Sequence, residues 1–264
     1  MHPNPLHLVF AFLFLASLAN AAPERQVVDG VTYHILSTPA DTVRIIWQDA
    51  TGKQVRTFPE AARHVRSQGL EVETVMNGGI FEPGGIPSGL LVQDGKELRP
   101  VNRKDGKGNF HLKPNGIFMI GPQGAAVIRT DEYPIAKAEV RQAVQSGPLL
   151  LRKGQVHPAF NAGSGSRLHR NGVGIAKDGR VVFAMTDANS AKFPNLHEFA
   201  RLFLALGCDD ALFLDGDLSQ MQSGNGIDTS TNRFGSIIVV TKSLPSAQSQ
   251  GQANSQQPAT PPRN

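Results

Sequence analysis

The chain repeats one local pattern, in which a short apolar run, a glycine-containing turn and a second apolar run follow one another. Three of these turns are the pairs Asp29-Gly30, Asp94-Gly95 and Asp178-Gly179. An Asp-Gly pair suits the two-residue turn with positive φ that closes a β-hairpin. Hairpin strands are antiparallel neighbours. We therefore expect an α+β fold with a large, strongly twisted, mostly antiparallel (mixed) sheet that curls toward a barrel.

Two segments carry the signals of helices, and we expect both helices to pack on this sheet. Each begins with a capping box, at Thr57–Glu60 and at Asn195–Glu198, in which the cap and the residue three positions later satisfy exposed backbone N–H groups. Glycines at Gly69 and Gly207 predict where the helices end. The second helix also places its apolar residues on one stripe, as a helix covering a core does.

The strand after the second helix leads directly into acidic residues. Residues 211–214 form an apolar run with an aromatic residue, which predicts a buried strand, and Asp215-Gly216-Asp217 follows at once. Asp215-Gly216 is also the sequence of a simple hairpin turn. However, a polar, glycine-containing loop follows instead of an immediate return strand. This difference makes Asp215 a candidate catalytic residue at the end of a strand.

The strand after the first helix ends in the same way. Its last apolar residue, Met76, is followed by Asn77-Gly78-Gly79. If the two strands lie side by side, Asn77 and Asp215 converge. We therefore predict a site that these two segments share.

Three other segments contain residue types that suit a binding site. Ser146-Gly147 precedes a predicted strand and is either a plain turn or a surface facing substrate. Arg170 lies beside a glycine-bracketed strand, where a guanidinium can bind a phosphate with two hydrogen bonds or simply be solvated. Asp187 ends another strand, where a turn or capping role is the commoner one.

The two ends of the chain differ in composition from the rest. Residues 1–21 contain an eleven-residue apolar stretch and an Ala-Asn-Ala cleavage site, which predict a secretory signal peptide. The alternative is that this segment is retained as an anchor. Residues 22–244 are predicted to be one domain, without stable membrane insertion after cleavage, and residues 245–264 a disordered Ser/Gln/Pro-rich tail. Because Cys208 is the single cysteine, no intrachain disulfide is possible, which suits a periplasmic location.

Charge and motif content exclude several classes of function. The formal net charge is +4 over 264 residues. One loop has an excess of cations, but it lacks the interleaved aromatics of a nucleic-acid surface, so we expect no nucleic-acid partner. No histidine pair has metal-ligand spacing, and no metal or other cofactor is predicted. The basic excess consists of Arg99, Arg103, Lys104, Lys107, His111 and Lys113, against Glu97 and Asp105.

Four segments together resemble the phosphodiester glycosidase domain family (N-acetylglucosamine-1-phosphodiester α-N-acetylglucosaminidase-like), in a bacterial secreted subgroup. They are Asn77-Gly-Gly-Ile-Phe, Ser146-Gly-Pro-Leu-Leu, His169-Arg-Asn-Gly-Val-Gly and the block from Glu198 to Gly216. The family commonly continues Leu-Asp-Gly with two glycines and two serines, whereas Asp217 to Gln220 stand here.

The resemblance implies a hydrolase that cleaves the glycosidic bond of a sugar-1-phosphodiester, on an envelope or extracellular glycan. Asp215 would act as nucleophile or as base on water, with Arg170 stabilising the departing phosphate. Asp217 is a candidate from its position alone. The expected partner is a carbohydrate or sugar-phosphate substrate. The predicted substrate-binding residues are Asn77, Gly78, Ser146, Gly147, Gly216 and Ser219.

Two alternatives remain open from the residues. In the first, Asp215, Asp217 and Asp187 hold Mg²⁺ or Ca²⁺, and the chain is a metal-dependent phosphodiesterase. In the second, the chain is a non-catalytic glycan-binding envelope protein. A shallow groove with ordinary titration of the carboxylates would favour the second alternative, and a deep pocket that holds Asp215 against Arg170 would favour an enzyme.

Overall fold

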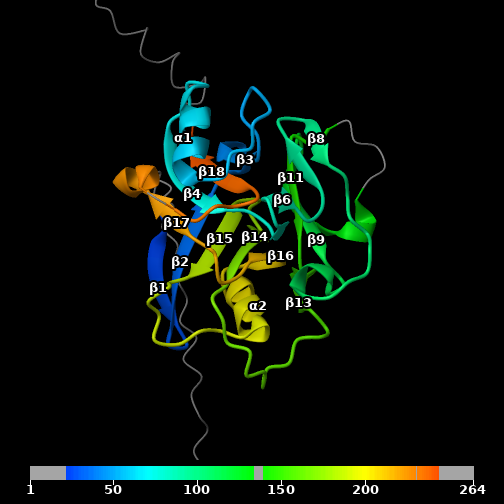
Figure 1. The fold of residues 1–264 in the computed structure, drawn as a ribbon. Coiled ribbons are helices and arrows are strands. Elements are labelled where there is room, and N and C mark those ends of the chain that lie inside the picture. The colour runs from blue at the N-terminus through cyan, green and yellow to red at the C-terminus, as the bar shows by residue number, and fades with distance from the viewer. Residues whose placement is uncertain (1–21, 134–138, 230, 244–264) are drawn as a thin grey trace, which may run out of the picture.

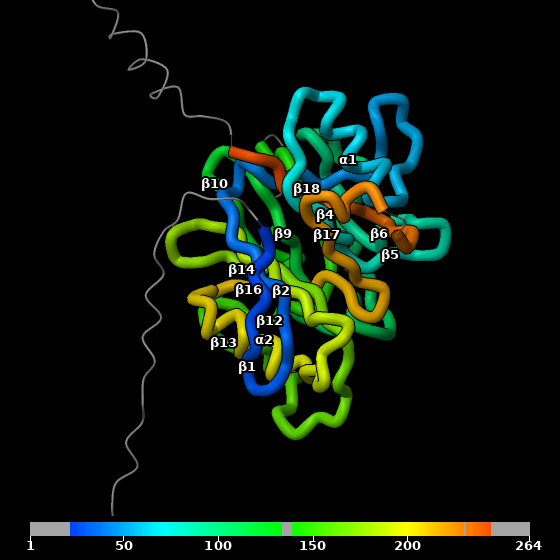
Figure 2. Tube along the Cα trace, turned by 90° about the vertical axis from the view of Figure 1, so that its left-hand side faces the viewer, coloured from blue at the N-terminus to red at the C-terminus, as the bar shows by residue number. Residues whose placement is uncertain are grey.

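The strands form three main antiparallel sheets and one small two-stranded ribbon. The computed structural model of the protein describes residues 22–133, 139–229 and 231–243. The seven-stranded sheet has the order β1-β2-β15-β14-β16-β12-β13, the five-stranded sheet β10-β9-β11-β7-β8, the four-stranded sheet β17-β4-β18-β3, and the ribbon β5-β6. Figures 1 and 2 show the four-stranded sheet with α1 in the upper part of the molecule, and β1, β2, β14 and β16 with α2 in the lower part.

The bounds of the elements are as follows. The seven-stranded sheet contains β1 (Glu24–Val28), β2 (Val31–Thr38), β12 (Leu149–Arg152), β13 (Gln155–Val156), β14 (Asn171–Ala176), β15 (Val181–Thr186) and β16 (Cys208–Asp215). The five-stranded sheet contains β7 (Leu91–Gln93), β8 (Lys96–Arg99), β9 (Gly116–Gly121), β10 (Gly124–Arg129) and β11 (Gln142–Ser146). The others are β3 (Val43–Ile46), β4 (Val72–Asn77), β17 (Met221–Ser223), β18 (Ile237–Thr241), β5 (Phe81–Glu82), β6 (Ile86–Pro87), α1 (Phe58–Arg66) and α2 (Leu196–Ala205).

One central core lies between the three main sheets, and each sheet has a second buried face. On β16, Leu212 and Leu214 point into the central core, whereas Ala211 and Phe213 point to the face that α2 covers. On β18, Ile238 lies in the central core and Ile237 faces α1. Because successive strand residues point to opposite faces, burial on both faces explains the continuous apolar runs of these strands.

The predicted helices and hairpins are confirmed, although the connection at Asp178-Gly179 is longer than a two-residue turn and only its glycine has positive φ. In α2, Glu198 N donates to Asn195 Oδ1 at 2.9 Å, and Asn195 N donates to Glu198 Oε2 at 3.2 Å. Gly207 has φ +78°, the left-handed conformation expected after a helix. At the β1–β2 hairpin Asp29 and Gly30 both have positive φ, as the Asp-Gly turn requires.

The predicted α+β class and the large, twisted antiparallel sheets are confirmed. Every described strand pair is antiparallel. The strands are divided among separate sheets that enclose the core, and none of the sheets closes into a barrel.

The predicted signal peptide at 1–21 and the predicted tail at 245–264 lie outside the described residues, so both stay predictions, as does the single-domain span 22–244. Within the described ranges, neither helix has the length and apolar character that a transmembrane crossing requires.

Candidate active site

Asp215 lies where the seven-stranded and four-stranded sheets meet. It is the last residue of β16 and lies opposite Asn171 of β14. The chain does not turn back from here as a hairpin, because the next strand, β17, pairs with β4 of the other sheet. The Asp215-Gly216 pair is therefore a crossing between sheets. This crossing explains why the polar loop that follows has no return strand in the same sheet.

The predicted convergence of Asn77 with Asp215 is observed, although β4 and β16 belong to different sheets. Asn77 Nδ2 donates to Asp215 Oδ2 at 3.1 Å and lies 3.3 Å from Ser219 Oγ. Asn77 Oδ1 accepts from Gln220 N at 3.0 Å. A backbone N–H can only donate, so this bond fixes which side-chain atom of Asn77 is oxygen. The NH₂ group of Asn77, and not its oxygen, must then face the Asp215 carboxylate.

The Asp215 carboxyl group holds its proton more tightly than an ordinary aspartate. Burial raises its pKa to about 6, and the nearby Asp217 also raises it. Two hydrogen bonds act in the opposite direction, from Asn77 Nδ2 and from Gly216 N, which donates to Asp215 Oδ1 at 2.8 Å. Each carboxylate oxygen thus accepts one bond, which orients the group while leaving lone pairs for a ligand or water.

Arg170 precedes β14 and is only 2% exposed. Its Nη2 donates to the Ser166 carbonyl at 3.0 Å, and its guanidinium lies over the Phe213 ring, 5.7 Å from the centroid. Within the described residues Arg170 Nε has no hydrogen-bond partner, and no hydrogen bond or ion pair joins Arg170 to Asp215. Burial lowers the pKa of Arg170, and Asp217 partly opposes this change.

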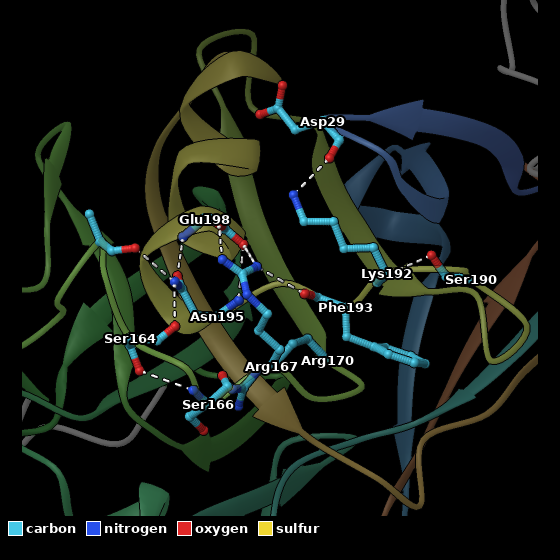
Figure 3. Close-up of polar contacts among 11 residues, drawn as sticks. Asp29, Ser164, Ser166, Arg167, Arg170, Ser190, Lys192, Phe193, Asn195 and Glu198 are labelled. Atoms are coloured by element: carbon cyan, nitrogen blue, oxygen red, sulfur yellow. Dashed lines mark hydrogen bonds and ion pairs between the residues drawn. The ribbon is translucent and has the colours of Figure 1, made fainter.

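The loop before Arg170 is held against the beginning of α2 (Figure 3). Arg167 donates from Nη2 to Glu198 Oε1 at 2.7 Å and from Nη1 to the Phe193 carbonyl at 3.1 Å. Asn195, the cap of α2, donates to the carbonyl of Ser164 at 3.1 Å. The capping residues of the helix therefore also fix the loop that carries Arg170.

Ser146 and Gly147 are buried, and Ser146 lies beside the end of β16. Ser146 Oγ donates to the Leu214 carbonyl at 2.7 Å and accepts from Ile80 N at 3.3 Å. The hydroxyl thus ties the end of β16 to the segment after Asn77. A Cβ on Gly147 would lie 2.9 Å from the Phe110 carbonyl oxygen, so this position has no room for a side chain.

The other predicted residues lie around the same junction, except for Asp187. Gly78 N donates to the Ser236 carbonyl at 2.9 Å, and Gly216 accepts from Ser219 N at 2.9 Å. Asp217 is exposed. Asp187 instead contacts Arg25 and His34.

The described residues contain no group of three His, Cys, Asp or Glu side chains that could hold a metal ion. Asp215, Asp217 and Asp187 therefore do not form the ligand set of the metal-dependent alternative. Cofactor use itself stays a prediction.

Two residues that the sequence analysis did not select also belong to this site. Asn171 is fully buried, and its Nδ2 donates to the Asn77 carbonyl at 3.1 Å. His169 Nδ1 lies 3.3 Å from the Gly216 carbonyl oxygen. Both residues flank Arg170 in the sequence, and a polar Asn opening an otherwise apolar strand was the available signal for Asn171.

The fold and the site together define a sheet-rich α+β protein with an oriented, partly buried carboxylate at the junction of two sheets. Residues 70–243 match the profile of the family described as phosphodiester glycosidase (NAGPA). A relative from Escherichia coli strain K12, described as uncharacterized protein YigE, is 32% identical over 227 residues, which cover 84% of this chain and 87% of the relative. The chain therefore belongs to the phosphodiester glycosidase family.

Solved structures are similar to this fold at low sequence identity. The catalytic domain of zebrafish N-acetylglucosamine-1-phosphodiester α-N-acetylglucosaminidase, auto-inhibited by its pro-peptide, aligns with a TM-score of 0.58 and 17% identity. The alignment covers 83% of this chain and 81% of the zebrafish chain. A hypothetical protein from Synechocystis aligns with a TM-score of 0.51 and 14% identity, over 83% of this chain and 61% of that one.

Proposed function

We propose that the chain hydrolyses the glycosidic bond of a sugar-1-phosphodiester, with Asp215 as its catalytic carboxylate. The observation that carries this proposal is the Asp215 carboxyl group itself. It has a pKa of about 6 and is oriented by the amide of Asn77 and the N–H of Gly216. A carboxylate whose proton affinity is raised toward neutral pH is suited to taking a proton from an attacking water. Membership of a glycosidase family supports the reaction class.

The reaction needs one bond to break and one to form. The bond between the anomeric carbon and the phosphate oxygen breaks, and its electron pair leaves with the phosphate. With Asp215 as base, water adds its oxygen to the anomeric carbon and gives a proton to the carboxylate. With Asp215 as nucleophile, a glycosyl-enzyme forms first and water then hydrolyses it. The products are a free sugar and a phosphate monoester.

The leaving group determines whether the site must donate a proton or stabilise negative charge. A phosphate monoester leaves without full protonation, so stabilising its negative charge matters more than donating a proton. Arg170 is a buried cation that directly precedes Asn171, the residue whose side chain contacts Asn77. Its Nε has no hydrogen-bond partner among the described residues. We assign Arg170 the role of stabilising the negative charge of the departing phosphate. Asn77 was expected to bind substrate, but it is only 1% exposed and its NH₂ group donates to Asp215 and Ser219, so we assign it to orienting the carboxylate. Ser219 is assigned to sugar hydroxyls or phosphate oxygens.

The contact between Asp215 and Arg170 that was expected of an enzyme is not among the described hydrogen bonds and ion pairs. Support for an enzyme over the non-catalytic glycan-binding alternative comes instead from the raised pKa of Asp215, which a module that only binds sugar hydroxyls does not need. No specific observation favours the metal-dependent alternative. Activity that persists in a strong chelator would argue against it.

A panel of sugar-1-phosphodiesters tests the proposal, with the sugar varied and a methyl aglycone kept constant. The wild-type chain should release free sugar, and Asp215→Asn should lower kcat/KM by at least a hundredfold. Asp178→Asn is the matched control, because Asp178 is exposed and lies past the far end of β14 from Asn171. Turnover that Asp215→Asn leaves unchanged would exclude Asp215 as base or nucleophile.

We also propose that the substrate is a glycan of the cell envelope or the exterior, in a periplasmic or secreted setting. The predicted signal peptide at 1–21 supports this location. Export of the mature chain, followed by fractionation and N-terminal sequencing, tests it.

A further inference from the structure

One short segment of the chain has an excess of cations over anions that equals the excess of the whole chain. Residues 99–113 contain five Lys and Arg residues and one Asp, a formal charge of +4, and the whole chain also has a formal charge of +4. The rest of the sequence is therefore formally neutral. This segment, which we call the basic loop, joins β8 to β9 (Figure 1).

Both ends of the basic loop contact the segment around Ser146, which lies next to the candidate active site. At its beginning, Asn102 N donates to Gln145 Oε1 at 2.8 Å, and Gln145 Nε2 donates to the Asn102 carbonyl at 2.6 Å. At its end, the Phe110 carbonyl oxygen lies 2.9 Å from where a Cβ on Gly147 would be. Gln145 and Gly147 flank Ser146, whose hydroxyl binds the Leu214 carbonyl next to Asp215. The loop is therefore built onto the segment that supports the catalytic carboxylate.

The tip of the basic loop is ordered by its own contacts. Lys104 N donates to Asn102 Oδ1 at 3.0 Å, and Lys113 Nζ donates to the Arg103 carbonyl at 3.2 Å. Lys113 also forms an ion pair with Asp105, which neutralises the single acid of the segment. Arg103, Lys104 and Lys107 remain exposed. Three exposed cations thus lie close in sequence on one loop whose ends contact the residues on either side of Ser146.

We infer that the basic loop binds the aglycone of the substrate, and that this aglycone carries at least one further phosphate. This inference rests on the proposed function. A single phosphodiester brings one negative charge, for which the buried Arg170 already supplies a cation. Three more exposed cations, at Arg103, Lys104 and Lys107, lie on a loop whose ends contact Gln145 and Gly147, and they match additional anionic groups on the aglycone. The substrate class is therefore a sugar-1-phosphodiester whose aglycone carries one or more further phosphates.

The experiment compares two substrates with the same sugar. One has a methyl aglycone and a single phosphodiester charge, and the other has an aglycone with one additional phosphate. Lys104→Glu/Lys107→Glu is the test variant. Lys177→Glu is the control, because Lys177 is also exposed and lies at the far end of β14, roughly 20 Å from Asn171 at the usual strand rise.

For charges roughly 10 Å apart, the double reversal should lower kcat/KM on the two-phosphate substrate by about fivefold at ~0.01 M ionic strength and by about twofold at ~0.15 M. The methyl substrate should lose less at both salt concentrations, and Lys177→Glu should change neither. Equal losses on both substrates, or equal effects of the test and control variants, would overturn the inference.

A binding measurement separates this inference from the proposed reaction. Inorganic tripolyphosphate is titrated into Asp215→Asn, with and without the double reversal, by calorimetry. If neither substrate is cleaved but tripolyphosphate binding weakens with the double reversal, the basic loop is retained as an anion site and the proposed reaction is wrong. If substrates are cleaved and tripolyphosphate binding does not depend on Lys104 and Lys107, the reaction is retained and the inference is wrong. A thymidine oligonucleotide that inhibits more strongly than the phosphorylated glycan would overturn the assignment of a glycan.

Discussion

Replacing Asp215 by Asn should change the unfolding free energy relative to wild type, and this difference should favour the variant more at neutral pH than at acidic pH. The folded state raises the pKa of this carboxyl group to about 6, and burial is the main cause. The folded protein therefore binds the proton more tightly than the unfolded chain does. This preference contributes stability that is fully present below the unfolded pKa and is lost as the pH rises through about 6.

The magnitude follows from the difference between the two pKa values. The ordinary value is 3.8, so the shift is about two units, and each unit corresponds to about 1.4 kcal/mol. Ionised Asp215 then costs the folded state about 3 kcal/mol at pH 7.5 and about 1 kcal/mol at pH 4.5. An Asn at this position does not titrate. The difference in unfolding free energy between variant and wild type should therefore change by about 2 kcal/mol, in favour of the variant, from pH 4.5 to pH 7.5.

Urea unfolding at both pH values measures this change, with Asp178→Asn as the control. In Asp215→Asn the new NH₂ group faces a hydrogen-bond donor, either Asn77 Nδ2 or Gly216 N. One donor is then left without an acceptor, which lowers the unfolding free energy by about 1–3 kcal/mol. That cost does not depend on pH, so it cancels when the two pH values are compared. If the difference between variant and wild type is the same at pH 4.5 and pH 7.5, the reasoning from burial is refuted.

Three other substitutions test separate parts of the site. Asn77→Asp replaces the donor to Asp215 with a second carboxylate, so the acidic limb of the kcat/KM profile should move up by one pH unit or more, as pH–rate measurements would show. Gly78→Ala places a Cβ 2.4 Å from Ser236 Oγ and should lower the unfolding free energy by about 1–3 kcal/mol, and Ser236→Ala in the same chain should restore part of the loss. Arg170→Met should keep the melting temperature within a few degrees, since a buried cation without a carboxylate partner adds little stability, yet lower kcat/KM at least tenfold. A shared collapse of folding and activity in Arg170→Met would contradict the assigned role.

The parts of the fold predicted from sequence depend on contacts between residues close in the chain. The Asp29-Gly30 turn and the cap at Asn195 are examples, because positive φ and unpaired N–H groups are local requirements with few suitable residue types. The apolar run before Asp215 also predicted its own burial. The candidate position of Asp215 at a strand end followed from these local rules alone.

The division of the strands among sheets depends on pairings that no local pattern specifies. A run of apolar residues indicates that a strand is buried, but it does not predict which strand will lie beside it. For this reason β17 could not be assigned to β4, and the single sheet expected from the hairpins is three sheets around one core.

The contacts within the candidate active site also depend on the packing of segments that are distant in sequence. The sequence by itself determined the hairpins, the two capped helices and the carboxylate at the end of β16. Only the tertiary structure brought Asn77 to Asp215, buried Arg170 against Phe213 and placed Asn171 behind Asn77. The physical reason is that the desolvation and hydrogen bonds that tune a carboxylate come from residues distant in sequence, and their positions are set by packing of the whole core.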